Sequence, residues 1–195
     1  MEQVRSFIAI ELPDELRLAL GTLQTRLKSH NQPWVKWVDP YSIHLTLKFL
    51  GNIAAGRLDE ILKAMKEATE GIPALHLKVN GLGVFPNPRR VQVAWVGLNG
   101  EITILSQLQQ RLEISLAQLG FARESRPFTP HLTLARVRDR ASAEERQAFE
   151  QVIANARFEA GYEFEAAAIC LIRSQLTREG AVYHQIGSVG LKKPL

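Results

Sequence analysis

The sequence predicts an α+β protein made of two lobes whose sheets face each other, and two observations carry this prediction. The tetrapeptide His-Leu-Thr-Leu occurs twice, at residues 44–47 and at residues 131–134. Short β-favouring runs and amphipathic helical segments also follow one another in the same strand, helix, strand order in both parts of the chain. An internal repeat of this kind is typical of two related halves.

Length and composition favour one compact unit. With 195 residues, 46% of them hydrophobic, the chain can bury one sizeable core, so we expect a single domain spanning residues 1–195. Glu11 interrupts the first apolar run, so neither a signal peptide nor a membrane span is expected. The single Cys170 forbids an internal disulfide and fits a cytoplasmic location. A net charge of +4 permits an anionic partner such as RNA.

In the first half, period-two alternation marks strands and recurring leucines at helical spacing mark helices. Asp14 is placed to cap the first helix, and Gly71 closes the second. The predicted strands cover residues 5–12, 34–38 and 44–50, and the predicted helices run from Asp14 to about Ser29 and from Ala54 to Glu70.

The second half repeats these patterns. Ser142 followed three residues later by Glu145 predicts a capping box at a helix start. The runs at 75–79 and 91–96 suggest an antiparallel pair. The predicted helices cover residues 102–119 and 141–155, and the predicted strands include the second motif, residues 167–173 and residues 181–187, with a turn through 178–180 between the last two.

The two motifs place chemistry on facing strands. Because strand side chains alternate, each His shares a face with its Thr, while the two Leu lie on the other face. Two imidazoles suit a reaction that removes one proton and delivers another, such as in-line attack of water on a phosphodiester. Thr46 and Thr133 can donate hydrogen bonds to the nonbridging phosphate oxygens. This chemistry requires no metal and no cofactor.

Other interpretations of these histidines are less favoured. A single His-x-Thr pair is as compatible with an ordinary polar strand face, but two identical copies favour a site. A metal centre built on two histidines lacks a third ligand in the sequence, which has neither a His-Glu-x-x-His helix nor clustered carboxylates. His30, His76 and His184 have no Thr two residues on, and we interpret them as surface or structural residues.

The residues around the motifs resemble the two-histidine phosphoesterase superfamily, and within it the bacterial and archaeal RNA 2′,3′-cyclic phosphodiesterases, historically called 2′-5′ RNA ligases. The resemblance rests on both motifs, on residues 5–10, 44–51 and 130–136, and on a late segment that includes 171–174 and Tyr183. It implies a bilobal α+β fold with pseudo-twofold symmetry, in which two mainly antiparallel sheets face a central cleft and the helices lie outside.

The resemblance also implies an activity, namely the metal-independent opening of an RNA 2′,3′-cyclic phosphate to a 2′-phosphomonoester. By motif position His44 becomes the proton donor to the leaving 3′-oxygen and His131 the proton acceptor from water. The near-identical motifs alone do not distinguish this order from its reverse.

Further residues are candidates for substrate binding. Arg136 suits phosphate, although strict alternation places it opposite His131 unless the strand bends there. Lys48 alternates with His44, yet a lysine at this place is commonly solvated. Phe49, Trp34 and Trp37 can stack on an unpaired base, with core packing favoured for Trp37 and Trp95, and Arg126, Arg89 and Arg90 can line an RNA-binding rim.

The expected partner is RNA with a 2′,3′-cyclic phosphate end; neither a membrane nor an obligate protein partner is expected, and a monomer suffices. Two alternatives remain at this point. The same histidines can run the reverse reaction as a 2′-5′ RNA ligase, and a catalytically inactive RNA-binding module can adopt the same fold. Retention of both His and both Thr argues against the inactive module.

Overall fold

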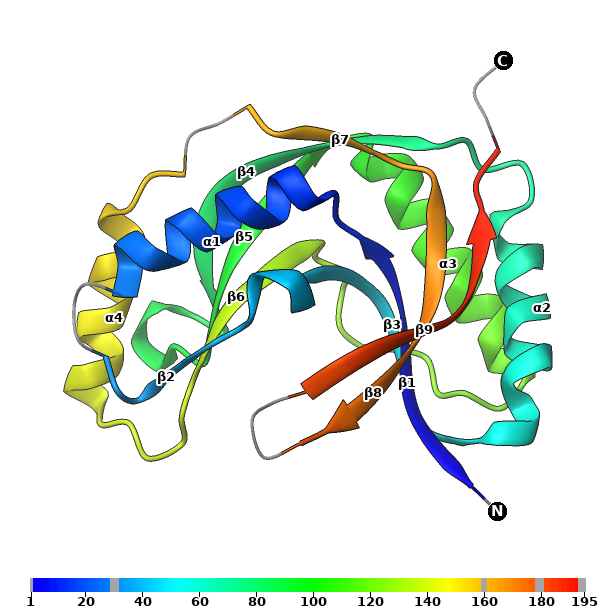
Figure 1. The fold of residues 1–195 in the computed structure, drawn as a ribbon, viewed down its shortest axis with the longest axis horizontal. Coiled ribbons are helices and arrows are strands. Elements are labelled where there is room, and N and C mark those ends of the chain that lie inside the picture. The colour runs from blue at the N-terminus through cyan, green and yellow to red at the C-terminus, as the bar shows by residue number, and fades with distance from the viewer. Residues whose placement is uncertain (1, 29–31, 159–160, 178–180, 193–195) are drawn as a thin grey trace.

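The computed structural model describes residues 2–28, 32–158, 161–177 and 181–192. These residues form an α+β fold, as predicted (Figure 1). The strands are β1 (Gln3–Glu11), β2 (Val35–Trp37), β3 (His44–Ala54), β4 (Leu75–Phe85), β5 (Val93–Gly100), β6 (His131–Val137), β7 (Glu163–Ala166), β8 (Ala168–Leu176) and β9 (Ala181–Gly190). The α-helices are α1 (Asp14–Lys28), α2 (Leu58–Thr69), α3 (Ile102–Gln118) and α4 (Ala143–Asn155).

The strands form a curled antiparallel sheet in the order β7-β4-β5-β6-β3-β1-β8-β9, and β2 also pairs with β6. Its two halves meet where β3 pairs with β6 at Leu45 and Leu132. The two predicted sheets are therefore joined through this one residue pair. The halves correspond strand for strand, because β1 and β8 flank β3 in the same order in which β5 and β4 flank β6.

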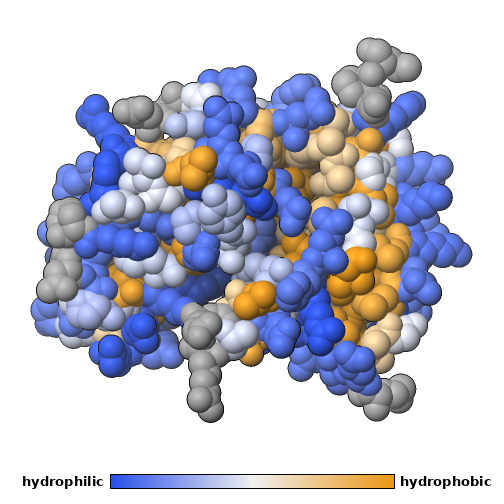
Figure 2. Space-filling model, viewed as in Figure 1, coloured by the Kyte–Doolittle hydropathy of each residue, from blue (hydrophilic) through white to orange (hydrophobic). Residues whose placement is uncertain are grey.

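The helices lie outside the curled sheet, α1 and α4 on one side and α2 and α3 on the other (Figure 1). One helix from each half contacts the central strand of the other half. Helix α1 follows β1 in sequence but hydrogen-bonds to β6 through Gln24. Helix α3 follows β5 in sequence but contacts β3 through Glu113. This exchange locks the two halves together. Hydrophilic residues dominate the face seen in Figure 2, and hydrophobic residues gather on its right-hand side.

The core is buried between helices and sheet and uses the leucines that the helical spacing singled out, among them Leu20, Leu105 and Leu108, which are fully buried. A smaller apolar cluster of Phe7, Ala9, Cys170 and Ile172 lies apart from this core. Burial raises the pKa of the Cys170 thiol to about 11, as suits a packing residue. No helix in the described ranges is long and apolar enough to cross a membrane.

Most predicted elements are confirmed, including the β4–β5 pair and the Ser142–Glu145 capping box. Three differences have local causes. Strand β7 was not predicted, because its sequence Glu-Phe-Glu-Ala offers only two apolar residues. Strand β4 extends to Phe85, well beyond the predicted end, and the helix predicted from Ala54 begins as a 3-10 turn before α2. The turn at 178–180 and His30 lie outside the described residues.

Candidate active site

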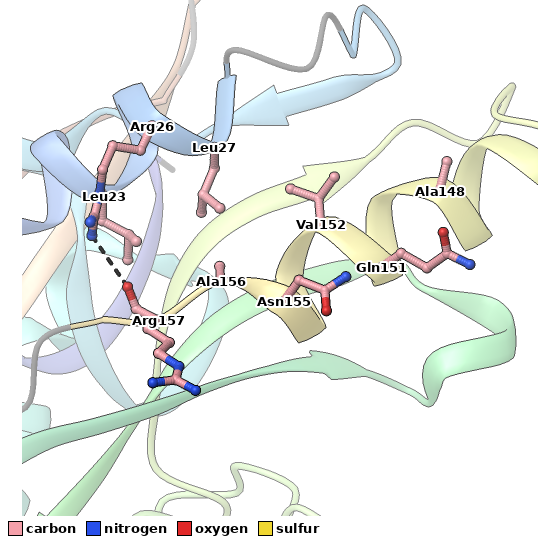
Figure 3. Close-up of a pocket in the computed structure, with 9 residues that line it drawn as sticks. All are labelled: Leu23, Arg26, Leu27, Ala148, Gln151, Val152, Asn155, Ala156 and Arg157. Atoms are coloured by element: carbon pink, nitrogen blue, oxygen red, sulfur yellow. Dashed lines mark hydrogen bonds between the residues drawn. The ribbon is translucent and has the colours of Figure 1, made fainter.

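One hollow of about 460 Å³ lies between α1 and α4 and has an apolar floor (Figure 3). Arg26 crosses one end of it and donates to the carbonyl of Arg157 at 3.3 Å. Its described lining contains neither a histidine nor a carboxylate, so it offers no acid or base for catalysis. The lining consists of Leu23, Arg26, Leu27, Ala148, Gln151, Val152, Asn155, Ala156 and Arg157.

A larger groove of about 780 Å³ contains the chemistry that the motifs predicted. Both motif histidines and both motif threonines line it. Arg5 and Arg136 are the charged residues among its described lining, which includes no Asp or Glu. The groove therefore favours an anion. Its remaining lining residues are Ser6, Phe7, Val38, Ser42, Ile43, Phe49, Gly51, Asn52, Ser174, Leu176, Ala181 and Tyr183.

The strand register explains why the motifs face one groove. Leu45 and Leu132 are paired across the β3–β6 contact, and both are fully buried. Because the two strands run antiparallel, Thr133 lies on the His44 side of this pair, and Thr46 lies on the side of the second histidine. The predicted alternation is confirmed within both tetrapeptides.

The alternation ends immediately after each motif because both strands bulge. In the pair formed by β1 and β3, Ala9 lies opposite Thr46 and Ile8 lies opposite Lys48. Leu47 of β3 therefore has no partner on β1 and is the extra residue of a bulge. In the pair formed by β5 and β6, Trp95 likewise lies opposite Thr133 and Ala94 lies opposite Ala135. Leu134 of β6 therefore has no partner on β5 and is the extra residue of the second bulge. A β-bulge re-aims the side chains that follow it.

The bulges correct two predictions made from strict alternation. Arg136 does not lie opposite His131; it lines the groove with it. Lys48 does not share the groove face with His44, and it is not solvated, since only 7% of it is exposed. Phe49 takes the place that alternation assigned to Lys48 and lines the groove while 65% exposed.

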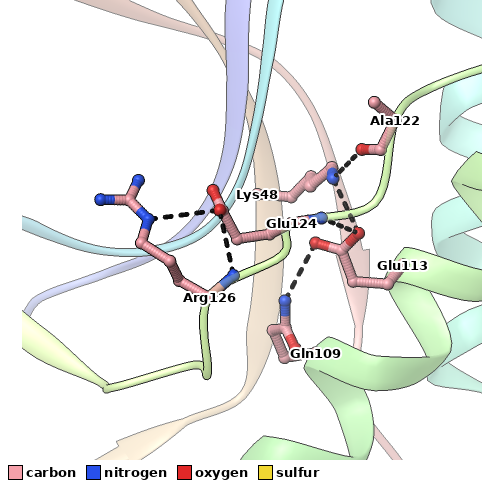
Figure 4. A network of polar contacts seen from close by, with 6 residues as sticks. All are labelled: Lys48, Gln109, Glu113, Ala122, Glu124 and Arg126. Carbon is pink, nitrogen blue, oxygen red and sulfur yellow. Dashed lines mark hydrogen bonds and ion pairs between the residues drawn. The ribbon is translucent and has the colours of Figure 1, made fainter.

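Lys48 instead forms a buried network (Figure 4). Its ammonium donates to Glu113 Oε2 at 2.7 Å and to the carbonyl of Ala122 at 2.6 Å. Glu113 also accepts from Gln109 Nε2 at 3.1 Å and from the backbone N–H of Glu124 at 3.2 Å. The network ties β3 and α3 to the segment that leads into the second motif.

Gln24 holds the backbone at the second bulge, as the Lys48 network does near the first. This residue of α1 is fully buried and donates through Nε2 to the carbonyls of Val38, at 2.7 Å, and Leu134, at 3.0 Å. The hydrogen bond to Leu134 holds the backbone that turns Arg136 into the groove. Gln24 was missed in the sequence, where its signal is a polar residue four positions after Leu20 on an otherwise leucine-rich helix face.

Both histidines are oriented by a backbone carbonyl two residues upstream. His44 Nδ1 lies 2.8 Å from the carbonyl of Ser42, and His131 Nδ1 lies 2.7 Å from the carbonyl of Thr129. A carbonyl oxygen only accepts, so Nδ1 carries a hydrogen in each ring. This fixes Nε2 as the nitrogen that gains or loses a proton.

The surroundings lower the pKa of both imidazoles. Burial lowers the pKa of His44 from 6.5 to about 4, against its hydrogen bond to Ser42, and the charges of Arg136 and Arg17 add to the lowering. Burial and the Arg136 charge also lower the pKa of His131. Both rings are therefore neutral near pH 7 in the free protein, and an anion beside Arg136 would raise both pKa values.

Aromatic rings pack against the two imidazoles. The Phe7 ring stacks on His44 with centroids 4.5 Å apart, and Tyr183 meets the same imidazole edge-on at 5.2 Å. Phe85 meets His131 edge-on at 5.0 Å, and Trp95 lies 6.5 Å from it. These rings restrict the imidazole orientations. Trp95, for which the sequence favoured core packing, thus also packs beside His131.

The remaining candidates lie outside the groove lining. Trp37 packs on Phe149, as its predicted core role requires, and Trp34 packs against the same core. Arg126 is exposed and pairs with Glu124 at 3.4 Å. Arg89 and Arg90 are exposed in a 3-10 turn, and His76 and His184 are exposed on strands. Within the described ranges, no three His, Cys, Asp or Glu side chains are grouped to hold a metal.

Several groove residues were not singled out in the sequence. Arg5, Ser6 and Phe7 lie on β1, and Ser174 lies on β8. Their position depends on long-range strand pairing, in which Ser6 faces Gly51 on one side and Arg173 on the other. The available signal was the resemblance of residues 5–10 to the family, which did not assign them a role.

A sequence model of the family described as LigT like Phosphoesterase matches residues 10–95 and, separately, residues 96–183. The chain belongs to this family. Each matched part contains one His-Leu-Thr-Leu motif, in agreement with the two structural halves.

Known relatives match over nearly the full chain. A protein of Methanothermobacter thermautotrophicus named RNA 2′,3′-cyclic phosphodiesterase is 33% identical and covers 93% of this chain and 95% of its own. A protein of the same name from Methanocaldococcus jannaschii is 30% identical over 94% of this chain and 98% of its own.

Solved structures share the fold. A Thermus thermophilus protein superposes with a TM-score of 0.77 at 27% identity, covering 97% of this chain and 98% of that protein. The Escherichia coli LigT protein complexed with 3′-AMP superposes with a TM-score of 0.73 at 24% identity, covering 97% of this chain and 99% of LigT, which shows the fold alone.

Proposed function

We propose that this protein is an RNA 2′,3′-cyclic phosphodiesterase that opens the cyclic phosphate at an RNA end to a 2′-phosphomonoester. The observation that carries the proposal is the convergence of two matching His-Thr pairs on one groove that has two arginines and no carboxylate in its described lining. Relatives that match nearly the whole chain and carry this name support it.

His131 is the proposed general base. Its Nδ1–H is held by the Thr129 carbonyl, so the neutral ring presents Nε2 as an acceptor. Its lowered pKa keeps it unprotonated near neutral pH in the free protein, so it meets the substrate in the form that a base requires. It takes a proton from water as the water oxygen bonds to phosphorus in line with the departing 3′-oxygen.

His44 is the proposed general acid, which delivers a proton to that 3′-oxygen as the P–O3′ bond breaks. With a pKa of about 4 in the free protein, His44 is almost entirely neutral near pH 7. Burial is the main cause of this lowered pKa, and the Arg136 charge adds to it; the substrate phosphate stabilises the imidazolium directly and also offsets the Arg136 charge. Substrate binding therefore favours protonation of His44, the general acid. After each turnover, proton exchange with solvent returns both histidines to their starting protonation states.

Thr46, Thr133 and Arg136 are the proposed phosphate-binding residues. The two hydroxyls donate to the nonbridging oxygens, and the guanidinium fork can contact two oxygens at once. All three line the groove beside the histidines. Donors aimed at the phosphate stabilise the charge that persists through the displacement. These residues and the histidines complete the reaction with no metal or other cofactor.

Phe49 is the proposed stacking surface for the terminal base. Its ring lies on the groove wall, 6.0 Å from the Phe7 ring. An exposed aromatic ring beside a phosphate site is the usual platform for an unpaired nucleobase.

The whole chain acts as one unit in this proposal. Each half supplies one His and one Thr to the groove, so the two lobes form a single catalytic domain. A monomer has the complete set of proposed residues, and no second protein is required.

The test uses an oligoribonucleotide that ends in a 2′,3′-cyclic phosphate, incubated with purified protein in the presence of EDTA. We expect hydrolysis to a 2′-phosphate end that resists a 3′-specific phosphatase. His44→Ala and His131→Ala should each lower turnover by roughly 10²- to 10⁴-fold. A 3′-phosphate product, net ligation to a 5′-hydroxyl RNA, or full dependence on added metal would each contradict the proposal.

A further inference from the structure

Two cations are held side by side at the end of the groove. Strand β2 pairs with β6 so that Lys36 lies directly opposite Arg136. Their neighbours Val35, Ala135 and Val137 are buried, so the alternation puts Lys36 and Arg136 on the other, exposed face of the two strands.

This pairing works against stability. Like charges directly opposite each other in an antiparallel pair repel. None of the ion pairs in the described ranges involves Lys36 or Arg136. Arg138, two residues after Arg136, is exposed and is likewise in none of these ion pairs. A repulsion without internal compensation points to an anionic ligand that neutralises the two charges.

The position of Lys36 connects this pair to the proposed reaction centre. Arg136 lines the groove together with His131 and Thr133. Val38 also lines it and lies two residues after Lys36, and its N–H bonds to the Leu134 carbonyl at 2.9 Å, which continues the β2–β6 ladder. Lys36 therefore lies beside Arg136, two residues before the groove-lining Val38 and on the side away from His131.

The opposite end of the groove is less cationic. Arg5 lines the groove there. However, Arg173, which pairs with the adjacent Ser6, has its charge offset by Glu2 at 3.6 Å. The Lys36 end combines three exposed cations with no carboxylate partner in the described part of the chain, so it has the stronger attraction for a polyanion.

We propose that Lys36, next to Arg136, forms a second phosphate subsite, which binds the phosphodiester next to the terminal nucleotide of an RNA chain, while Arg136 itself faces the terminal cyclic phosphate. The inference rests on the proposed function and deepens it. The enzyme then distinguishes an RNA end from a cyclic mononucleotide, because a mononucleotide has no second phosphate to place beside Lys36.

The test compares two substrates that share one terminal nucleoside: a cyclic mononucleotide and a short oligoribonucleotide with the same 2′,3′-cyclic end. Lys36→Gln should lower the ratio of the two kcat/KM values, oligonucleotide over mononucleotide, roughly threefold to tenfold, the scale of one exposed phosphate contact. The loss should appear in KM. The slope of log kcat/KM against log salt for the oligonucleotide should flatten by about 0.7.

Three further variants sharpen the result. Lys36→Arg should keep the ratio, since the charge remains. Lys63→Gln, an exposed lysine on the distant helix α2, should leave it unchanged. Arg5→Gln tests the opposite end of the groove. If Lys36→Gln leaves the ratio of the two kcat/KM values unchanged, or if the ratio falls only in Arg5→Gln, the subsite is wrong although the protein is still active. If the wild-type protein hydrolyses neither substrate, the proposed function itself is refuted.

Discussion

Leu47 and Leu134, the last residues of the two motifs, are each the extra residue of a β-bulge. Because both strands bulge at the same place, the fifth residue after each histidine faces the groove. That residue is Phe49 in the first half and Arg136 in the second. The two halves are thus alike at the histidines and differ beside them, with an aromatic ring on one wall and a cation on the other.

Replacing Gln24 tests how the second bulge is held. Gln24→Leu removes two hydrogen bonds to the Val38 and Leu134 carbonyls and should cost about 1–3 kcal/mol of unfolding free energy, measured by urea denaturation. Turnover should also fall because Arg136 loses its fixed position. Thr25→Ala, an exposed change on the same helix, is the control. Wild-type stability in Gln24→Leu would show that the bulge needs no support from α1.

Breaking the buried ion pair should be more damaging than removing it entirely. Lys48→Met leaves the Glu113 carboxylate buried without its cation and should cost about 3–5 kcal/mol. The double variant with Glu113→Leu should regain much of this loss. Urea denaturation of the two single variants and the double variant measures the coupling. A single variant as stable as the double variant would contradict the buried pair.

Sequence patterns predicted the motif faces, most elements and the paired halves, because these depend on local alternation and helical spacing. They failed where a single inserted residue reverses the alternation. Strict alternation alone places Lys48 on the groove face and Arg136, unless the strand bends, on the opposite face; the two bulges reverse both placements and put Arg136, a predicted substrate-binding residue, in the groove. Nothing in the leucines of the motifs marks a bulge. Partners such as Gln24 and Leu134 are 110 residues apart and meet only in the folded chain.

Phe49 offers a test of base stacking. Because its ring is 65% exposed, Phe49→Ala should leave stability almost unchanged. It should raise KM for a cyclic nucleotide roughly fivefold to a hundredfold, the range expected for loss of one stacked base. Leu18→Ala removes a similarly exposed apolar side chain from α1 and is the control. An equal effect on an abasic cyclic ribose phosphate would argue against stacking.

The lowered pKa of His44 makes stability depend on pH. Its pKa is about 4 when folded and about 6.5 when unfolded, so the unfolded chain binds more protons between these values. The contribution of the neutral His44 to the free energy of unfolding is therefore complete above about pH 6.5. This contribution is lost as the pH falls toward 4, by up to about 3 kcal/mol.

Urea denaturation at pH 7 and pH 4.5 measures this loss. His44→Gln cannot titrate at this position, so it should lose less stability than the wild type over the same interval. Because both proteins share all other ionisable groups, the difference between them isolates His44. Parallel losses in the two proteins would show that the His44 pKa is not lowered by folding.

The division of labour between the two histidines is tested most directly by changing the leaving group. A 2′,3′-cyclic phosphorothiolate whose 3′-bridging oxygen is replaced by sulfur expels a thiolate, which needs no general acid. We predict that His44→Gln hydrolyses this substrate at close to the wild-type rate, while His131→Gln stays impaired because water still needs its base. Rescue of His131→Gln in place of His44→Gln would reverse the assignment, and rescue of neither would contradict paired acid and base catalysis.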